Sequence, residues 1–141
     1  MSHELSKRLS IVVSHLYPNL VNNPLDGDYY LQNDSDGNGT YLVWKTDKVT
    51  KPTDTELANA KEAAVDADWW RILRKTRDEK LVASDWTQGA DVPSDIKTKW
   101  ATYRAKLRDL PTTVSKPAYS ELIKLEVTTS GIDTLMPDEP S

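Results

Sequence analysis

The chain has 141 residues, of which 18 are basic and 22 acidic, so its formal net charge is −4. With 38% hydrophobic and 28% charged residues it has the composition and length of one ordinary globular domain. The absence of cysteine excludes disulfide scaffolds, thiolate metal sites and thiol nucleophiles, and two histidines are too few for a multi-histidine metal site. No apolar run approaches the ~18 residues of a membrane span and none resembles a signal peptide, so we expect no membrane contact.

The first third of the chain predicts a helix followed by a β-hairpin. Apolar residues recur at helical spacing up to Pro18: Leu5, Leu9, Val12, Val13 and Leu16. Because residues 11–13 are β-branched, a strand there stays open as an alternative. Two aromatic and β-branched runs, 28–32 and 40–44, flank a polar loop in which Gly37 and Gly39 supply positive φ. These runs indicate an antiparallel hairpin.

The middle of the chain predicts two helices. Thr53 and Glu56 form a capping-box pattern, and no glycine or proline interrupts residues 57–82, so we expect a helix that ends near residues 83–84. A second helix is expected from Pro93 to Pro111, with apolar residues at a/d spacing: Ile96, Trp100, Tyr103, Leu107 and Leu110. Two helices joined by a loop of about ten residues are expected to fold back as an antiparallel hairpin.

The remaining tail has one apolar run, Tyr119–Thr128, which we interpret as a strand, and the charged and proline-containing end, 137–141, is expected to be disordered. The sequence therefore predicts an α+β fold: an N-terminal helix, a β-hairpin, an antiparallel helical hairpin and an extended C-terminal segment. The corresponding segments are residues 1–50, 51–111 and 112–141.

No pattern for catalysis or metal binding is complete. Asp34–Gly39 matches the first half of a calcium loop, D-x-D-x-N-G, but Lys45 stands at the twelfth position, where a bidentate glutamate belongs. Ser84 lacks a nucleophile elbow, and His15 is expected to be a packed or surface histidine. We therefore predict no metal, no cofactor and no enzymatic activity, and interpret the loop as a polar hairpin turn.

Basic residues on the two predicted helices suggest an alternative function in nucleic-acid binding. Trp69 and Trp70 could stack on bases beside two basic stripes: Arg71, Arg74, Lys75, Arg77 and Lys80, and then Lys97, Lys99, Arg104, Lys106 and Arg108. Acidic residues are interleaved with both stripes, and the isoelectric point is near 5.2. Solvated helix faces therefore explain the stripes better, and nucleic acid is an unfavoured partner.

An ordered set of uncommon residues begins at Arg77. It continues with Leu81, Ser84-Asp85-Trp86-Thr87-Gln88, Asp91-Val92-Pro93, Trp100, Tyr103-Arg104 and Leu107-Arg108-Asp109-Leu110-Pro111. This stretch resembles the phage tail assembly chaperone-like domain of tailed bacteriophages, and it covers about a quarter of the chain. The resemblance departs after Pro111, because such proteins often close with a tail rich in proline and tryptophan, whereas residues 112–141 contain no tryptophan.

The resemblance implies a non-enzymatic bacteriophage protein that binds tail, baseplate or tail-fibre proteins in the host cytoplasm, with multiple copies in a symmetric assembly. Two roles stay open: a chaperone that leaves the particle, and a minor subunit that is retained in the virion tail. The motif itself is interpreted first as a fold signature, in which Trp86 closes the helix pair and Arg104 reaches Asp85 or Asp91. The candidate partner-binding residues are Trp69, Trp70, Asp85, Trp86 and Arg104. Trp69 and Trp70 are ~100° apart on one helix, so we expect at least one of them at the surface.

Overall fold

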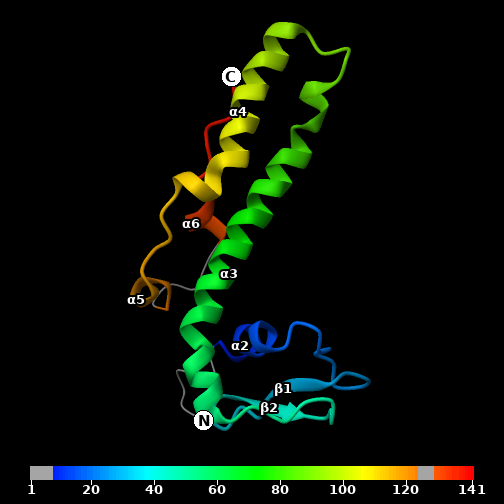
Figure 1. Cartoon of the computed structure of the whole chain (residues 1–141), viewed down its shortest axis with the longest axis vertical. Coiled ribbons are helices and arrows are strands. Elements are labelled where there is room, and N and C mark those ends of the chain that lie inside the picture. The colour runs from blue at the N-terminus through cyan, green and yellow to red at the C-terminus, as the bar shows by residue number, and fades with distance from the viewer. Residues whose placement is uncertain (1–7, 124–128) are drawn as a thin grey trace. The chain divides into compact units, whose positions relative to one another are not determined.

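The computed structural model describes residues 8–123 and 129–141. The chain divides into two compact units, Met1–Asp68 and Trp69–Ser141, and the boundary falls within one long helix, α3 (Asp54–Ala83). The fold is mixed α+β, as predicted, with the strands in the first unit and helices in both (Figure 1). None of the helices in the described part of the chain is long and apolar enough to cross a membrane.

The first unit packs a short helix and a β-hairpin together with the start of α3. Its elements are α2 (Leu9–Leu16), β1 (Tyr29–Asn33) and β2 (Thr40–Trp44). Their buried side chains form one core: Leu9, Val12, Val13, Tyr29, Leu42, Leu57 and Ala64. The structure thus confirms the predicted helix and hairpin and excludes a strand at residues 11–13, whereas Leu5 lies outside the described residues.

The hairpin pairs Tyr29 with Trp44 and Asn33 with Thr40 in antiparallel register. Gly37 and Gly39 take φ values of +84° and +83° in the connecting loop, which is the conformation that glycine adopts without strain. The rings of Tyr29 and Trp44 stack with their centroids 5.9 Å apart, so this pair ties both strands into the core.

Helix α3 begins where the capping pattern predicts. The Thr53 hydroxyl accepts a hydrogen bond from the Glu56 backbone N–H at 3.1 Å and donates one to the Glu56 carboxylate at 3.3 Å. One of the otherwise unsatisfied N–H groups of the first turn is thereby bonded.

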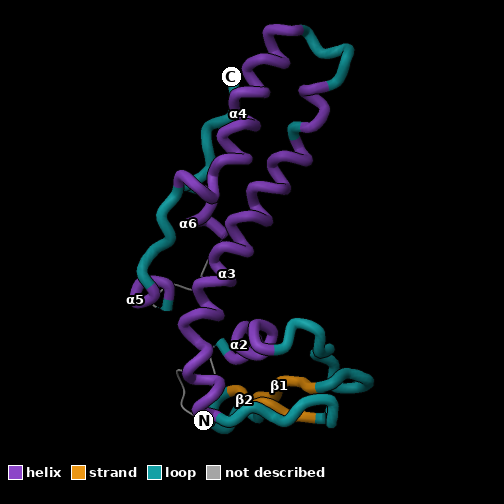
Figure 2. Tube along the Cα trace, viewed as in Figure 1, coloured by secondary structure: helices purple, strands orange, loops and turns teal. Residues whose placement is uncertain are grey.

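The second unit contains the end of α3, the 3₁₀ turn η1 (Asp85–Gln88) and three further helices, α4 (Ser94–Thr113), α5 (Tyr119–Leu122) and α6 (Thr129–Asp133) (Figure 2). In Figure 1, α4 runs back beside the C-terminal part of α3, as predicted for an antiparallel helical hairpin. The buried apolar side chains of this unit are Trp69, Leu73, Tyr103, Leu107, Leu110, Leu122 and Ile132.

Three local predictions are wrong. Helix α4 does not stop at Pro111 but continues to Thr113, because the hydroxyls of Thr112 and Thr113 donate to the carbonyls of Asp109 and Leu110 in the last turn. Ile96, expected on the buried seam, is 37% exposed.

The third error concerns the tail. Tyr119–Leu122 forms helix α5 rather than the start of a strand, and the rest of that predicted strand, residues 124–128, lies outside the described residues. Ala118 precedes α5 in extended conformation, and its carbonyl accepts the N–H groups of Glu121 and Leu122. A single helical turn can therefore bury Leu122 without a partner strand.

Candidate protein-binding site

The turn between α3 and α4 is held by one arginine. The Arg104 guanidinium donates through Nη1 to the Leu81 carbonyl at 2.6 Å and to Ser84 Oγ at 2.7 Å. Through Nη2 it donates to the Asp85 carboxylate at 2.8 Å, so the sequence prediction that Arg104 reaches Asp85 is confirmed. The side chain of Arg104 is only 14% exposed, whereas that of Asp85 is 63% exposed. One largely covered cation thereby fixes the end of α3 to α4.

The buried hydroxyls of Ser84 and Thr87 and the amide of exposed Gln88 complete this network. Ser84 Oγ donates to the Lys80 carbonyl at 2.8 Å, and Thr87 Oγ1 donates to the Ser84 carbonyl at 2.6 Å. Gln88 Nε2 donates to Thr87 Oγ1 and to the Lys97 carbonyl of α4. These bonds add side-chain donors to carbonyls at the end of α3, and the bond from Gln88 ties the turn to α4.

Trp86 lies on the outside of the same turn. Its side chain was expected to close the helix pair, but the residue is 62% exposed. The prediction fails because Ser84 and Thr87 point inward, and the 3₁₀ turn leaves Trp86 outside. The Trp86 ring contacts half-buried Trp100 with centroids 6.0 Å apart, and Trp100 contacts buried Tyr103 at 5.4 Å. This aromatic row supports Trp86 from one side and leaves the other accessible.

The tryptophan pair on α3 separates into a core residue and a partly exposed one. Trp69 is 3% exposed and Trp70 is half-buried, and the two rings meet edge-to-face with centroids 4.9 Å apart. The Arg74 guanidinium lies 5.7 Å from the centroid of the Trp70 ring, within cation–π range. Trp69 is therefore a core residue, and the surface contact expected of the pair falls to Trp70.

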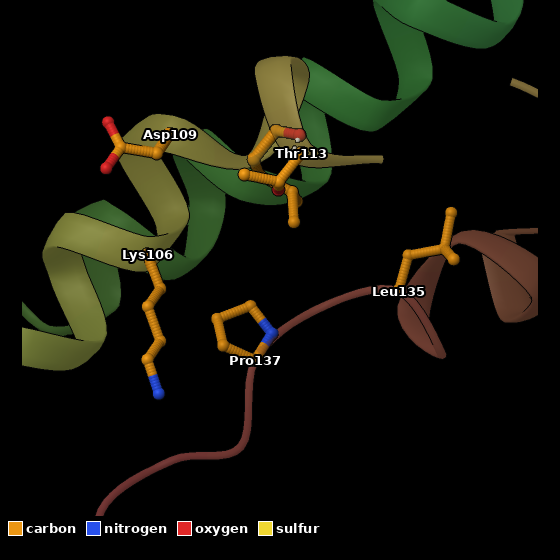
Figure 3. Close-up of a pocket in the computed structure, with 6 residues that line it drawn as sticks. Lys106, Asp109, Thr113, Leu135 and Pro137 are labelled. Atoms are coloured by element: carbon orange, nitrogen blue, oxygen red, sulfur yellow. Dashed lines mark hydrogen bonds between the residues drawn. The ribbon is translucent and has the colours of Figure 1, made fainter. Parts of the chain in front are cut away.

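A small cavity of about 270 Å³ lies between α4 and the C-terminal residues. Figure 3 shows Pro137 and Leu135 facing α4, with the Lys106 side chain extending beside Pro137. Burial raises the pKa of Tyr103, with a smaller contribution from the negative charge of Glu139. Residues 137–139, expected to be disordered, are thus placed against α4.

The segment Asp34–Gly39, which matches half of a calcium loop in sequence, is a hairpin turn whose carboxylates accept hydrogen bonds from neighbouring residues. Asp34 accepts hydrogen bonds from Gln32 Nε2 at 2.7 Å and from the Tyr41 hydroxyl at 3.0 Å. Asp36 accepts the Asn38 backbone N–H at 3.0 Å, and this bond lowers the pKa of its carboxyl group. Within residues 8–123 and 129–141, no group of three or more acidic or histidine side chains is placed to hold a metal ion.

Comparison with known protein families gives one match to each structural unit. Residues 70–124 match the family described as phage tail assembly chaperone protein. This match supports a phage tail assembly chaperone-like family for the second unit. Residues 9–68 match the family described as XkdW protein, a phage protein family. The two matches meet within two residues of the boundary between the units, Asp68/Trp69. No match was found among curated proteins or among solved structures.

The match over residues 70–124 confirms the resemblance based on Arg77–Pro111 and supports a role in phage tail assembly. Phage tail assembly chaperones are typically non-enzymatic, and their partners are tail-related proteins. The chaperone-like region holds four of the five predicted partner-binding residues, and Trp69 lies one position before it. Asp85, Trp86 and Arg104 are brought together at one turn. Sequence reasoning did not find exposed Val82 one turn earlier, because isolated valines in helices carry no signal of exposure.

Proposed function

We propose that the turn between α3 and α4 binds a protein of the phage tail, baseplate or tail fibre, with Trp86 as its anchor. The observation that carries this proposal is a tryptophan 62% exposed on a turn that the Arg104 network fixes. Tryptophan is the residue type most enriched among side chains that dominate binding energy. A rigid turn also loses little conformational entropy on binding.

The chain acts without catalysis in the host cytoplasm while the tail assembles, and several copies serve one symmetric tail. Of the two remaining roles, the chaperone that leaves is favoured by the family description. Retention as a minor subunit is the second, and mass spectrometry of purified virions distinguishes them.

Nucleic-acid binding is the weaker alternative, because several of the basic side chains are already engaged. Arg77 pairs with Asp78 at 2.8 Å, Arg104 with Asp85, and Arg74 lies over Trp70. If DNA were the partner, binding of duplex DNA to the full chain would weaken steeply as salt is raised.

The test uses the tail, baseplate and tail-fibre proteins of the same phage, each purified and titrated with the full chain by calorimetry. One of them is expected to bind, and Trp86→Ala is expected to weaken it about 30-fold without changing the melting temperature. Trp86→Phe should keep most of the affinity because it retains an aromatic ring. Binding by none of these proteins, or equal binding by Trp86→Ala, overturns the proposal.

A further inference from the structure

The loop between α2 and β1 carries the most exposed large apolar side chain that the structure describes. Leu25 is 89% exposed and Val21 is 55% exposed. Their neighbours Tyr17 and Leu20 pack against the core of the first unit, so the loop is anchored beside two uncovered apolar residues. Such exposure has a free-energy cost in water, which invites a functional explanation when the loop is also rigid.

Backbone hydrogen bonds close this loop on itself. The Asp28 N–H donates to the Val21 carbonyl at 2.7 Å, and the Gly27 N–H donates to the Asn23 carbonyl at 3.0 Å. The Asn23 N–H donates to the carbonyl of Tyr29 in β1 at 2.9 Å. The base of the loop is therefore an extension of the hairpin.

Side chains fix the loop a second time. Lys45, from the end of the hairpin, donates through Nζ to the carbonyls of Pro24 at 2.9 Å and Leu25 at 3.3 Å. Asn23 Oδ1 accepts the Leu25 N–H, and Asp28 Oδ2 accepts the Val21 N–H, both at 2.8 Å.

Close packing at Gly27 removes the remaining freedom. A β-carbon on Gly27 would lie 2.5 Å from the Asn23 nitrogen and 2.6 Å from the Val21 carbonyl oxygen, so the backbone passes too closely for any side chain. The position of Leu25 is thus determined by the loop rather than by contacts of its own side chain.

We propose that residues 20–28 form a preorganised docking loop that inserts Leu25, flanked by Val21, into an apolar pocket of a partner protein. Asp26 beside Leu25 is exposed and makes no ion pair with the described residues, so the rim of that pocket is expected to carry lysine or arginine. The loop lies outside residues 70–124 and is independent of the Trp86 surface. The chain then has two separate points of attachment, one in each unit.

The experiment places a photo-crosslinking amino acid at position 25 of the full chain, expressed during infection by a phage that lacks its own copy. We expect one cross-linked phage protein, and no such product from position 49, where Val49 is exposed in the same unit. Leu25→Asp and Asp26→Lys should each lower the yield of infectious particles at least about tenfold, a typical effect of losing a central contact. Val49 and Asp47 are also exposed, and the control substitutions Val49→Asp and Asp47→Lys should leave the yield of infectious particles unchanged.

A normal yield from Leu25→Asp overturns the proposal, provided that its melting temperature equals that of the parent chain. Equal cross-linking from positions 25 and 49 also overturns it, and so does a cross-link to a second copy of this chain. The Trp86→Ala substitution does not touch the loop. A chain that carries this substitution should therefore still form the cross-link from position 25, so the two proposals can fail independently.

Discussion

Arg104 makes three hydrogen bonds from a side chain that is only 14% exposed, and one of them is an ion pair with Asp85. We expect Arg104→Ala to lower the free energy of unfolding by about 2–3 kcal/mol, since hydrogen bonds to charged groups are worth more than neutral ones. Urea denaturation of the full chain measures this loss.

Two further variants separate geometry from charge at the same turn. Arg104→Lys should recover only part of the stability, because an ammonium cannot reproduce the planar fork that reaches Leu81 and Asp85 together. Asp85→Asn should cost less than about 1 kcal/mol, since its side chain is 63% exposed. Full stability in Arg104→Lys together with a clear loss in Asp85→Asn would show that the pair matters only through its charge.

Asp28 makes the first unit sensitive to acid. The backbone N–H of Val21 and the ammonium of Lys48, at 3.0 Å, hold the pKa of its carboxyl group below the ordinary value of 3.8. The folded chain then binds a proton at Asp28 less readily than the unfolded chain does. The stabilisation is complete above the unfolded pKa and is lost as the pH falls through the folded one.

We therefore expect a constant melting temperature above about pH 5 and a decline below about pH 4. Asp28→Asn should melt earlier at neutral pH and decline less steeply in acid. Circular dichroism melts at a series of pH values provide the comparison, and parallel curves for the parent and Asp28→Asn would contradict the assignment.

On helix α3 the two adjacent tryptophans are expected to respond differently to truncation. Trp69→Ala removes a buried side chain and should cost about 3–5 kcal/mol. Trp70→Ala removes a half-buried ring and its contact with Arg74, and should cost about 1 kcal/mol. Comparison of the two melting temperatures checks this, and virion yield from Trp70→Ala shows whether that ring also contacts a partner.

The α2–β1 loop depends on the absence of a side chain at position 27. Gly27→Ala should destabilise the chain by more than about 1 kcal/mol, because the close neighbours are backbone atoms that cannot turn aside. Gly89→Ala is the matched control, since its nearest neighbour is 3.5 Å away and its φ of −67° suits alanine. Thermal melts of the two variants should therefore differ, and equal melting temperatures would contradict the packing at Gly27.

The regular elements could be predicted from sequence because their signals are local. The capping pattern at Thr53, the glycines of the hairpin loop and the spacing of Tyr103, Leu107 and Leu110 each depend on nearby residues. The end of α4 was predicted two residues too early because the local signal there was Pro111. The hydroxyls that bond the carbonyls of the last turn belong to Thr112 and Thr113, which follow the proline.

The candidate sites could be predicted only in part. Arg104 and Asp85 carry opposite charges, so their pairing was foreseeable, but the bond from Arg104 to the Leu81 carbonyl spans 23 positions and has no sequence signal. The clamp from Lys45 onto Pro24 and Leu25 is equally non-local. The exposure of Leu25 and Trp86 follows from such contacts. For this reason the sequence did not indicate Leu25 as a site residue, and Trp86 was expected inside the helix pair rather than at the surface.

At the scale of the whole molecule, the chain holds two cores rather than one. Leu9, Val12 and Tyr29 belong to the first unit, whereas Leu107 and Leu110 belong to the second. We expect Leu107→Ala to lower hydrogen-exchange protection in α4 by more than it lowers protection in α2, and Val12→Ala to do the reverse. Equal loss in both units from either variant would show a single cooperative transition.

Trp86 also gives the protein a built-in optical reporter. Among the five tryptophans, Trp86 alone is exposed, and the other four are buried or half-buried. Solvent relaxation around an exposed indole shifts its emission to longer wavelength, so the red edge of the spectrum arises mainly from this residue. A partner that covers the α3–α4 turn should deplete that edge, and a partner that docks only at Leu25 should leave it unchanged. Unlabelled protein therefore reports, by the colour of its own fluorescence, which of the two surfaces is occupied.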